Sequence, residues 1–148
     1  MKKPIASAKD RFGITVGAVH RAWHAKLNSR LRPLGGSSAK LLAMLRISES
    51  KTGLVQRDLA NILVIEEPTL TRLLDRMEVD GLVRRMPSSR DRREKCVILT
   101  PAARPVLRKL RAAAVKLHSE ALEPFNDAEL RRGTELLAKV TARLEELP

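Results

Sequence analysis

Apolar residues recur at steps of three and four in the first part of the chain, which is the period of one face of an α-helix. This stripe consists of Phe12, Val16, Val19, Trp23, Leu27 and Leu31. Pro33, Gly35 and Gly36 follow it, and both residue types are typical of a helix end. The pattern predicts one long first helix that ends before Pro33.

Three shorter helices are predicted next. Ser37 can cap a second helix, and after a polar break residues 56–62 predict a third, with the apolar Val55 at its capping position. Pro68 fits the first turn of a fourth helix, because its missing N–H group would have no helical partner there. The core face of this fourth helix consists of Leu70, Leu73, Leu74 and Met77. Gly81 is suited to its C-terminal cap.

The period then changes to that of strands. Residues 82–86 and 95–99 predict two short strands, and the polar, arginine-rich segment 87–93 predicts the turn between them. The sequence therefore predicts a hairpin with a cationic tip.

Two further helices are predicted after the hairpin. Residues 100–101, Thr-Pro, predict the start of a fifth helix, but Pro105 would then lie too deep for the first turn, which predicts a kink or restart at Arg104. Asn126, with a glutamate three residues later, predicts a capping box that opens a last helix. Both helices carry apolar stripes like that of the first helix. The terminal helices therefore either pair with a second copy in a symmetric homodimer or pack into a bundle within one chain.

Composition and charge indicate the class of partner. The chain has 148 residues, 43% of them hydrophobic, which suits one compact domain. Its net charge of +12 favours a polyanionic partner, nucleic acid before an anionic membrane surface. Positive charge is densest between positions 81 and 118. We expect no membrane partner, because no segment approaches the roughly 20 apolar residues that span a bilayer and the basic residues cluster in a hairpin.

Little in the sequence supports an enzyme or a metal site. Cys96 is the only cysteine, which excludes a disulfide within the chain and, with no secretory segment near the N-terminus, indicates the cytoplasm. His20 and His24 have a spacing that two zinc ligands could use, but no third ligand is evident in that segment. No motif supports a nucleophile paired with a base. We expect no catalytic residues, metal or cofactor.

The fourth helix presents polar side chains suited to a DNA groove. With its apolar face inward, Pro68 and Arg72 lie on the far side, Thr69 and Arg76 on one flank and Thr71 on the other. Arginine can donate to guanine O6 and N7, and threonine can hydrogen-bond or contact a thymine methyl group. These five residues are the candidate recognition surface.

A simpler explanation exists for the two arginines of this helix. Arg72 and Arg76 could pair with the acids Asp75, Glu78 or Asp80 on a solvated face. This alternative needs no DNA.

The hairpin tip strengthens the DNA interpretation. Arg90, Arg92 and Arg93 crowd one turn around Asp91, an arrangement that costs repulsion unless an anion neutralises it. Narrow minor grooves attract such side chains. We expect Asp91 to hold one arginine and shape the turn. A helix-turn-helix followed by a basic hairpin is a winged arrangement, with one element for each groove.

Segment 57–101 carries a family resemblance. It reads RDLANILVIEEPTLTRLLDRMEVDGLVRRMPSSRDRREKCVILTP. It resembles the winged helix-turn-helix of the MarR/SlyA family of bacterial transcriptional regulators in its LA helix end, PTLTRLLDRME helix, GLVRR, wing motif DRR and terminal LTP. The segment covers about a third of the chain, and the flanking helices match the family's architecture without sharp motifs.

The resemblance implies a mainly α fold with a winged helix-turn-helix. It implies one domain over 1–148, with dimerisation helices at 1–33 and 101–148 and a DNA-binding lobe at 37–100. It also implies a homodimer that binds palindromic double-stranded DNA and responds to a small aromatic or anionic effector.

By position, the resemblance assigns roles to individual residues. Base contacts fall on Pro68, Thr69, Thr71 and Arg72, and wing contacts on Arg90, Asp91, Arg92 and Arg93. Phosphate contacts fall on Ser37, Ser38 and Gln56, and candidates for an effector pocket are His20, Trp23, His24, Met44 and Arg46. The alternative function is an architectural protein that coats duplex DNA without sequence preference, through counterion release alone.

Overall fold

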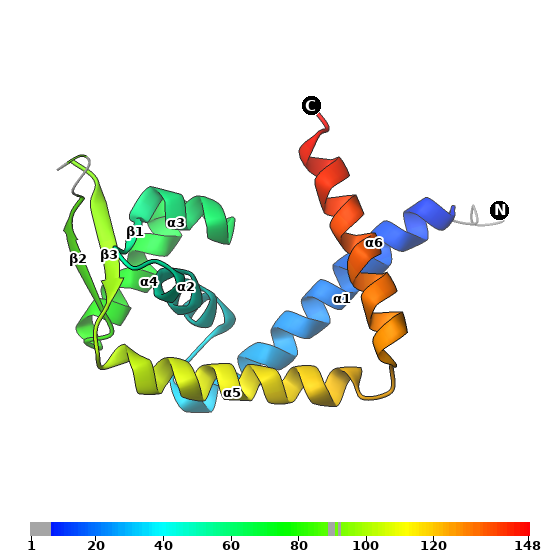
Figure 1. Cartoon of the computed structure of the whole chain (residues 1–148), viewed down its shortest axis with the longest axis horizontal. Helices are drawn as coiled ribbons and strands as arrows, with labels where there is room; N and C mark the ends of the chain where they lie inside the picture. The colour runs from blue at the N-terminus through cyan, green and yellow to red at the C-terminus, as the bar shows by residue number, and fades with distance from the viewer. Residues whose placement is uncertain (1–6, 89–90, 92) are drawn as a thin grey trace, which may run out of the picture. The chain divides into compact units, whose positions relative to one another are not determined.

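The computed structural model describes residues 7–88, 91 and 93–148, and it is mainly helical with a small sheet (Figure 1). Its helices are α1 (Ala8–Leu31), α2 (Ser38–Glu49), α3 (Gln56–Leu63), α4 (Glu67–Val79), α5 (Ala103–Leu122) and α6 (Asp127–Glu145), with a short 3-10 helix η1 (Arg32–Leu34) after α1. Its strands are β1 (Leu54–Val55), β2 (Val83–Pro87) and β3 (Lys95–Leu99). The chain divides into two compact units, Met1–Ala114 and Val115–Pro148.

Several helix ends lie where the sequence predicts them. The Ser37 hydroxyl accepts a hydrogen bond from the backbone N–H of Lys40 at 3.1 Å and so caps α2. Pro68 lies in the first turn of α4, and Gly81 follows the helix with φ of 70°. That left-handed conformation suits glycine. These local signals determine the start of α2 and both ends of α4, the second helix of the helix-turn-helix formed by α3 and α4.

The core of the first unit lies among α2, α3, α4 and the sheet. The predicted core face of α4 is confirmed, because Leu70, Leu73, Leu74 and Met77 are all buried. Met44 from α2, Leu59 from α3 and Val97 from β3 are also buried. Leu31 at the end of α1 and Leu110 of α5 are buried as well. Burial of leucine, methionine and valine side chains is thus the main stabilising term for this aromatic-poor chain.

Within the described residues, three strands form one antiparallel sheet in the order β1-β3-β2. Val83 pairs with Leu99 and Pro87 with Lys95, so the hairpin is present with β2 one residue later than predicted. The strand β1 was not predicted, because two residues are too short to show a period. It pairs with β3 through Val55 and Cys96 and links the start of α3 to the sheet.

The start of α5 corrects a prediction. The backbone N–H of Ala103 donates to the Thr100 carbonyl at 3.0 Å in a turn, and the helix begins at Ala103 rather than at Pro101. Pro105 is therefore its third residue, where a missing N–H costs nothing, and α5 is continuous to Leu122. The predicted kink or restart at Arg104 was wrong. The Thr100 hydroxyl donates instead to the Gly81 carbonyl at 2.5 Å, which ties the end of β3 to the end of α4.

The second unit contains the end of α5 and all of α6. The predicted capping box is confirmed: Asn126 Oδ1 accepts from the N–H of Glu129 at 3.0 Å, and Glu129 Oε2 accepts from the N–H of Asn126 at 2.9 Å. The apolar stripe of α6 is largely uncovered in the single chain, with Leu137 47% and Leu144 63% exposed. None of the helices in the described part of the chain is long and apolar enough to cross a membrane.

The turn between α3 and α4 stores backbone strain. Val64 has φ of 52°, and it is the only described residue other than glycine with a positive φ. The left-handed conformation costs an L-residue roughly 1–2 kcal/mol because Cβ approaches the next carbonyl. Its side chain is 89% exposed, so packing offsets little of this cost.

We expect Val64→Gly to raise the free energy of unfolding by about 1 kcal/mol, because glycine has no Cβ to clash in this conformation. Val79→Gly is a matched control: Val79 is also 89% exposed but ends α4 in a helical conformation, where glycine lowers stability by up to about 0.5 kcal/mol. Urea unfolding followed by circular dichroism, at one protein concentration, measures both. Equal stability of the two variants would contradict strain at Val64.

Candidate nucleic-acid interface

The candidate recognition surface on α4 is largely open to solvent. Pro68, Thr69, Arg72 and Arg76 are exposed. Thr71 is half-buried, and its hydroxyl accepts a hydrogen bond from Gln56 Nε2 of α3 at 2.9 Å. The helix thus presents two arginines and a threonine to an outside partner, with a second threonine fixed from behind.

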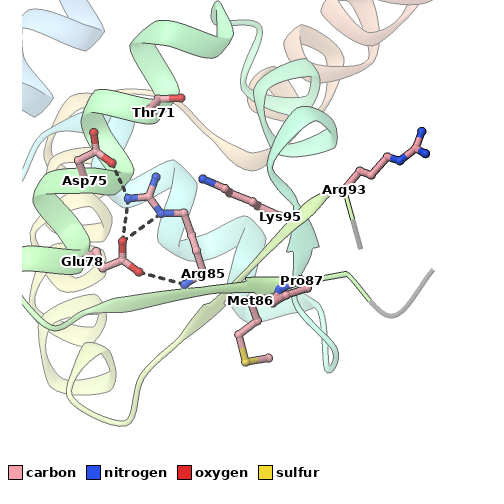
Figure 2. A pocket seen from close by; sticks show the side chains of 8 residues that line it. All are labelled: Thr71, Asp75, Glu78, Arg85, Met86, Pro87, Arg93 and Lys95. Carbon is pink, nitrogen blue, oxygen red and sulfur yellow. Dashed lines mark hydrogen bonds and ion pairs between the residues drawn. The ribbon is translucent and has the colours of Figure 1, made fainter. Parts of the chain in front are cut away.

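Arg85 of β2 binds the two acids Asp75 and Glu78 of α4 (Figure 2). Its Nη2 donates to Asp75 Oδ1 and, at 2.7 Å, to Glu78 Oε2, while its Nε donates to the same Glu78 oxygen at 3.0 Å. The backbone N–H of Arg85 donates to Glu78 Oε1 at 3.1 Å. The Arg85 side chain is only 15% exposed. One strand residue therefore binds two carboxylates that lie three positions apart on α4.

These contacts occupy the acids that could otherwise have paired with the arginines of α4. The third acid, Asp80, accepts a hydrogen bond from Lys40 Nζ of α2 at 3.0 Å. Within the ranges that the structure describes, neither Arg72 nor Arg76 forms an ion pair. The simpler explanation for these arginines is therefore not what the structure shows.

The contacts of Arg85 shift the pKa values of Glu78 and of Arg85 itself. Hydrogen bonds from the Arg85 side chain, and then from its backbone N–H, hold the pKa of Glu78 below its ordinary value. The hydrogen bond to Asp75 is the largest cause that raises the pKa of Arg85, against the opposing effect of desolvation. Both shifts favour the charged forms, so the ion pair persists at neutral pH.

The wing turn is shaped by Asp91. Its Oδ1 accepts from the backbone N–H of Arg93 at 2.9 Å, and its carbonyl accepts from the N–H of Glu94 at 3.0 Å. The predicted wing residues Arg90 and Arg92 lie outside the described residues, and Arg93 is exposed.

A second ion pair joins the base of the hairpin to the helix-turn-helix. Glu94 accepts a hydrogen bond from Arg57 of α3. The Arg57 side chain is 64% exposed, unlike that of Arg85. The hairpin is therefore joined to α3 at the surface and to α4 by a more enclosed contact.

A cleft of about 530 Å³ lies between α4 and the hairpin (Figure 2). It is lined by Thr71, Asp75, Glu78, Arg85, Met86, Pro87, Arg93 and Lys95. Lys95 and Arg93 line it together with the acids of α4, so the cleft is polar and mixed in charge. Its place beside the exposed arginines makes it part of the same surface.

The predicted phosphate contacts lie in different environments. Ser37 and Gln56 lie at the starts of α2 and α3 as predicted, and the buried Oε1 of Gln56 has no partner among the described residues. Ser38 is 6% exposed. Its hydroxyl lies 3.2 Å from Nδ1 of His24, and its N–H donates to the side chain of Asn28 at 2.8 Å. Ser38 is thus turned toward α1 and not toward a phosphate outside.

The effector-pocket candidates are only partly brought together. His20 and His24 lie one turn apart on α1, with ring centroids 4.3 Å apart, and Trp23 lies between them in sequence. Met44 belongs to the buried core, and Arg46 binds Glu49 on the exposed side of α2 at 3.1 Å. Among the described residues, no three His, Cys, Asp or Glu side chains are grouped to hold a metal ion.

Sequence reasoning missed the role of Arg85, although a signal was present. Alternate residues of a strand face the same side. Val83 is buried, so Arg85 had to face the protein as well. A charged side chain on an inward face needs a charged partner, and α4, which directly precedes this strand, carries Asp75 and Glu78. Because the hairpin was interpreted through its basic tip, the inward face of β2 was not considered.

Comparisons place the chain among transcriptional regulators. A family model described as the MarR family matches residues 37–95. The transcriptional regulator PA3341 is 36% identical, over 92% of this chain and 99% of its own, with a TM-score of 0.82. Wild-type MarR from E. coli in its apo form is 26% identical, over 92% and 98%, with a TM-score of 0.76. CouR from Rhodococcus jostii RHA1, bound to p-coumaroyl-CoA, shares the fold at 22% identity over 92% and 95%, with a TM-score of 0.79.

We expect the Glu78 carboxyl to titrate below its ordinary pKa of 4.5 and to return toward that value in Arg85→Gln, because Arg85 supplies the largest lowering effect. The contact therefore supports folding above the ordinary pKa and is lost as pH falls through the folded pKa. A pH titration followed by carbon-13 NMR of the Glu78 carboxyl carbon measures this pKa. Arg57→Gln, which removes the exposed pair with Glu94, should leave Glu78 unchanged. An identical Glu78 pKa in wild type and Arg85→Gln would contradict this account.

Proposed function

The chain belongs to the MarR family of transcriptional regulators, and from this we propose that it is a cytoplasmic homodimer that binds palindromic duplex DNA with sequence specificity. The observation that carries the proposal is the state of the charges on α4. Asp75 and Glu78 are bound by Arg85, and Asp80 by Lys40, while Arg72 and Arg76 are exposed without an ion pair among the described residues. Exposed arginines whose acidic neighbours toward the C-terminal end of α4 are paired elsewhere favour a polyanionic partner.

The specific contacts are proposed for the N-terminal half of α4. Arg72 can form two hydrogen bonds to guanine, and Thr69 can contact a neighbouring base edge or a thymine methyl group. Pro68 lies beside them on the exposed face, and Arg76 lies one turn further along. The Thr71 hydroxyl already accepts a hydrogen bond from Gln56. Thr71 can therefore offer a base its methyl group or donate its hydroxyl proton.

Binding strength is proposed to come from basic side chains around this helix. Arg93, with Arg90 and Arg92 predicted beside it in the sequence, would enter the minor groove or contact phosphates. Ser37 and Gln56 lie at helix starts, where backbone N–H groups favour phosphate oxygens. Such contacts bind any sequence and weaken as salt rises.

The homodimer is supported by uncovered apolar surface at both ends of the chain. On α1, Val16 is 41% and Val19 56% exposed, and on α6 Leu137 and Leu144 are exposed. Apolar residues at helical spacing are costly to leave in water, and a second copy is the simplest partner that covers them. Two copies would present two recognition helices to the half-sites of a palindrome.

We also propose that a small aromatic or anionic effector regulates DNA binding. The fold neighbour CouR was solved with p-coumaroyl-CoA, which combines both properties. In this chain, His20, Trp23 and His24 on α1 are the candidate contacts. An effector weakens DNA binding only if it favours a conformation other than the DNA-bound one. Thermal-shift screening of small aromatic acids, followed by DNA titration with each hit, tests this role.

For specific DNA binding, we expect Arg72→Ala to cost about 1–3 kcal/mol on the operator with little effect on random DNA, because Arg72 contacts bases. Arg92→Ala should weaken both complexes. The operator is found by footprinting the protein's own upstream region at fixed salt, and affinities are then measured by fluorescence anisotropy.

Arg143→Ala serves as the control for the loss of one arginine, since Arg143 is an exposed residue of α6 paired with Glu146. It should leave both affinities unchanged. Equal losses on operator and random DNA for Arg72→Ala would instead support the architectural, sequence-independent function.

A further inference from the structure

We propose that Arg85 is a specificity-determining residue, because it keeps Asp75 from pairing with Arg72. It touches no base itself. It acts through the charge of its partner, and so determines whether the base-contacting arginine is free. This inference rests on the proposed function of α4.

The geometry of α4 makes this competition direct. Arg72 and Asp75 are three positions apart in one helix, a spacing at which side chains are neighbours and opposite charges attract. Glu78 lies six positions from Arg72, beyond that range. Of the two acids that Arg85 binds, only Asp75 is therefore placed to bind Arg72.

In the structure, Asp75 is bound by Arg85 and not by Arg72. It donates to Asp75 and also makes two side-chain and one backbone hydrogen bond to Glu78, which fix its guanidinium beside both carboxylates. Its side chain is 15% exposed, whereas Arg72 is exposed to solvent. An arginine that surrounding contacts already hold in place loses less conformational entropy on pairing than an exposed one. Asp75 consequently pairs with the strand, and Arg72 projects outward from the helix.

Two other cations, Lys95 and Arg93, line the same cleft. The Arg93 side chain points away from Asp75 and Glu78 (Figure 2). Lys95 lacks the planar fork that lets arginine bind two carboxylates at once. We therefore expect it to leave Asp75 largely free when Arg85 is removed.

The test compares the ratio of operator affinity to random-DNA affinity among variants at one salt concentration. Arg85→Gln should lower this ratio about twofold, because an ion pair of Asp75 with Arg72 at this spacing competes with the base contact by about that factor. The double variant Arg85→Gln with Asp75→Asn should return the ratio to that of wild type, because the one carboxylate three positions from Arg72 is removed.

The matched control is Arg85→Gln with Glu78→Gln. It has the same net charge as the first double variant but retains Asp75, so its ratio should stay low. Melting temperatures of all variants identify any that fail to fold. The triple variant Asp75→Asn with Glu78→Gln and Arg85→Gln leaves no charged side chain at these three positions, and its ratio should also return to that of wild type.

Equal recovery by both double variants would overturn the inference, because net charge alone would then explain the effect. Failure of the Asp75→Asn double and the triple variant to recover would also overturn it, since Arg85 would then act only by holding the hairpin. An unchanged ratio in Arg85→Gln would show that Lys95 replaces it, again against the proposal. Failure of the proposed function is distinguished by Arg72→Ala, which would then lower both affinities equally whatever Arg85 does.

Discussion

The contact of Arg85 with Asp75 and Glu78 is the interaction on which the rest of the proposed DNA-binding surface depends. It joins β2, the first strand of the hairpin, to α4, and it pairs two acids that would otherwise be free beside Arg72. The net charge of +12 indicates a polyanion only in general terms. Because Asp75 and Glu78 are paired with Arg85, the exposed arginines of α4 form a local positive surface that can contact DNA.

The arrangement separates two contributions to binding. In the proposed function, specificity would depend on a few side chains of α4, which its buried leucines hold in the core. Strength would depend on the basic side chains of the hairpin and on helix starts, where salt screens the contacts. The other ion pair of the hairpin, between Arg57 and Glu94, lies at the surface. It contributes less to stability than the contact of Arg85, because exposed ion pairs are weak.

Local signals predicted most of the fold. Ser37, Pro68 and Asn126 each act within one helical turn, so their caps and starts could be predicted without the rest of the chain. The strand β1 could not, because two residues have no period. The start of α5 was misplaced because the Thr100 hydroxyl binds the carbonyl of Gly81, a contact between distant segments that no local pattern reveals.

The same distinction applies to the candidate site. Helical geometry predicted the exposed face of α4, whereas the pairing of its acids depends on how β2 lies against it and emerged only with the structure. Methylation interference on the operator tests the central claim most directly. N7 methylation of one guanine in each half-site should block wild-type binding and have no added effect on Arg72→Ala. If no guanine shows interference, or if Arg72→Ala is blocked equally, Arg72 does not contact that base and the account is contradicted.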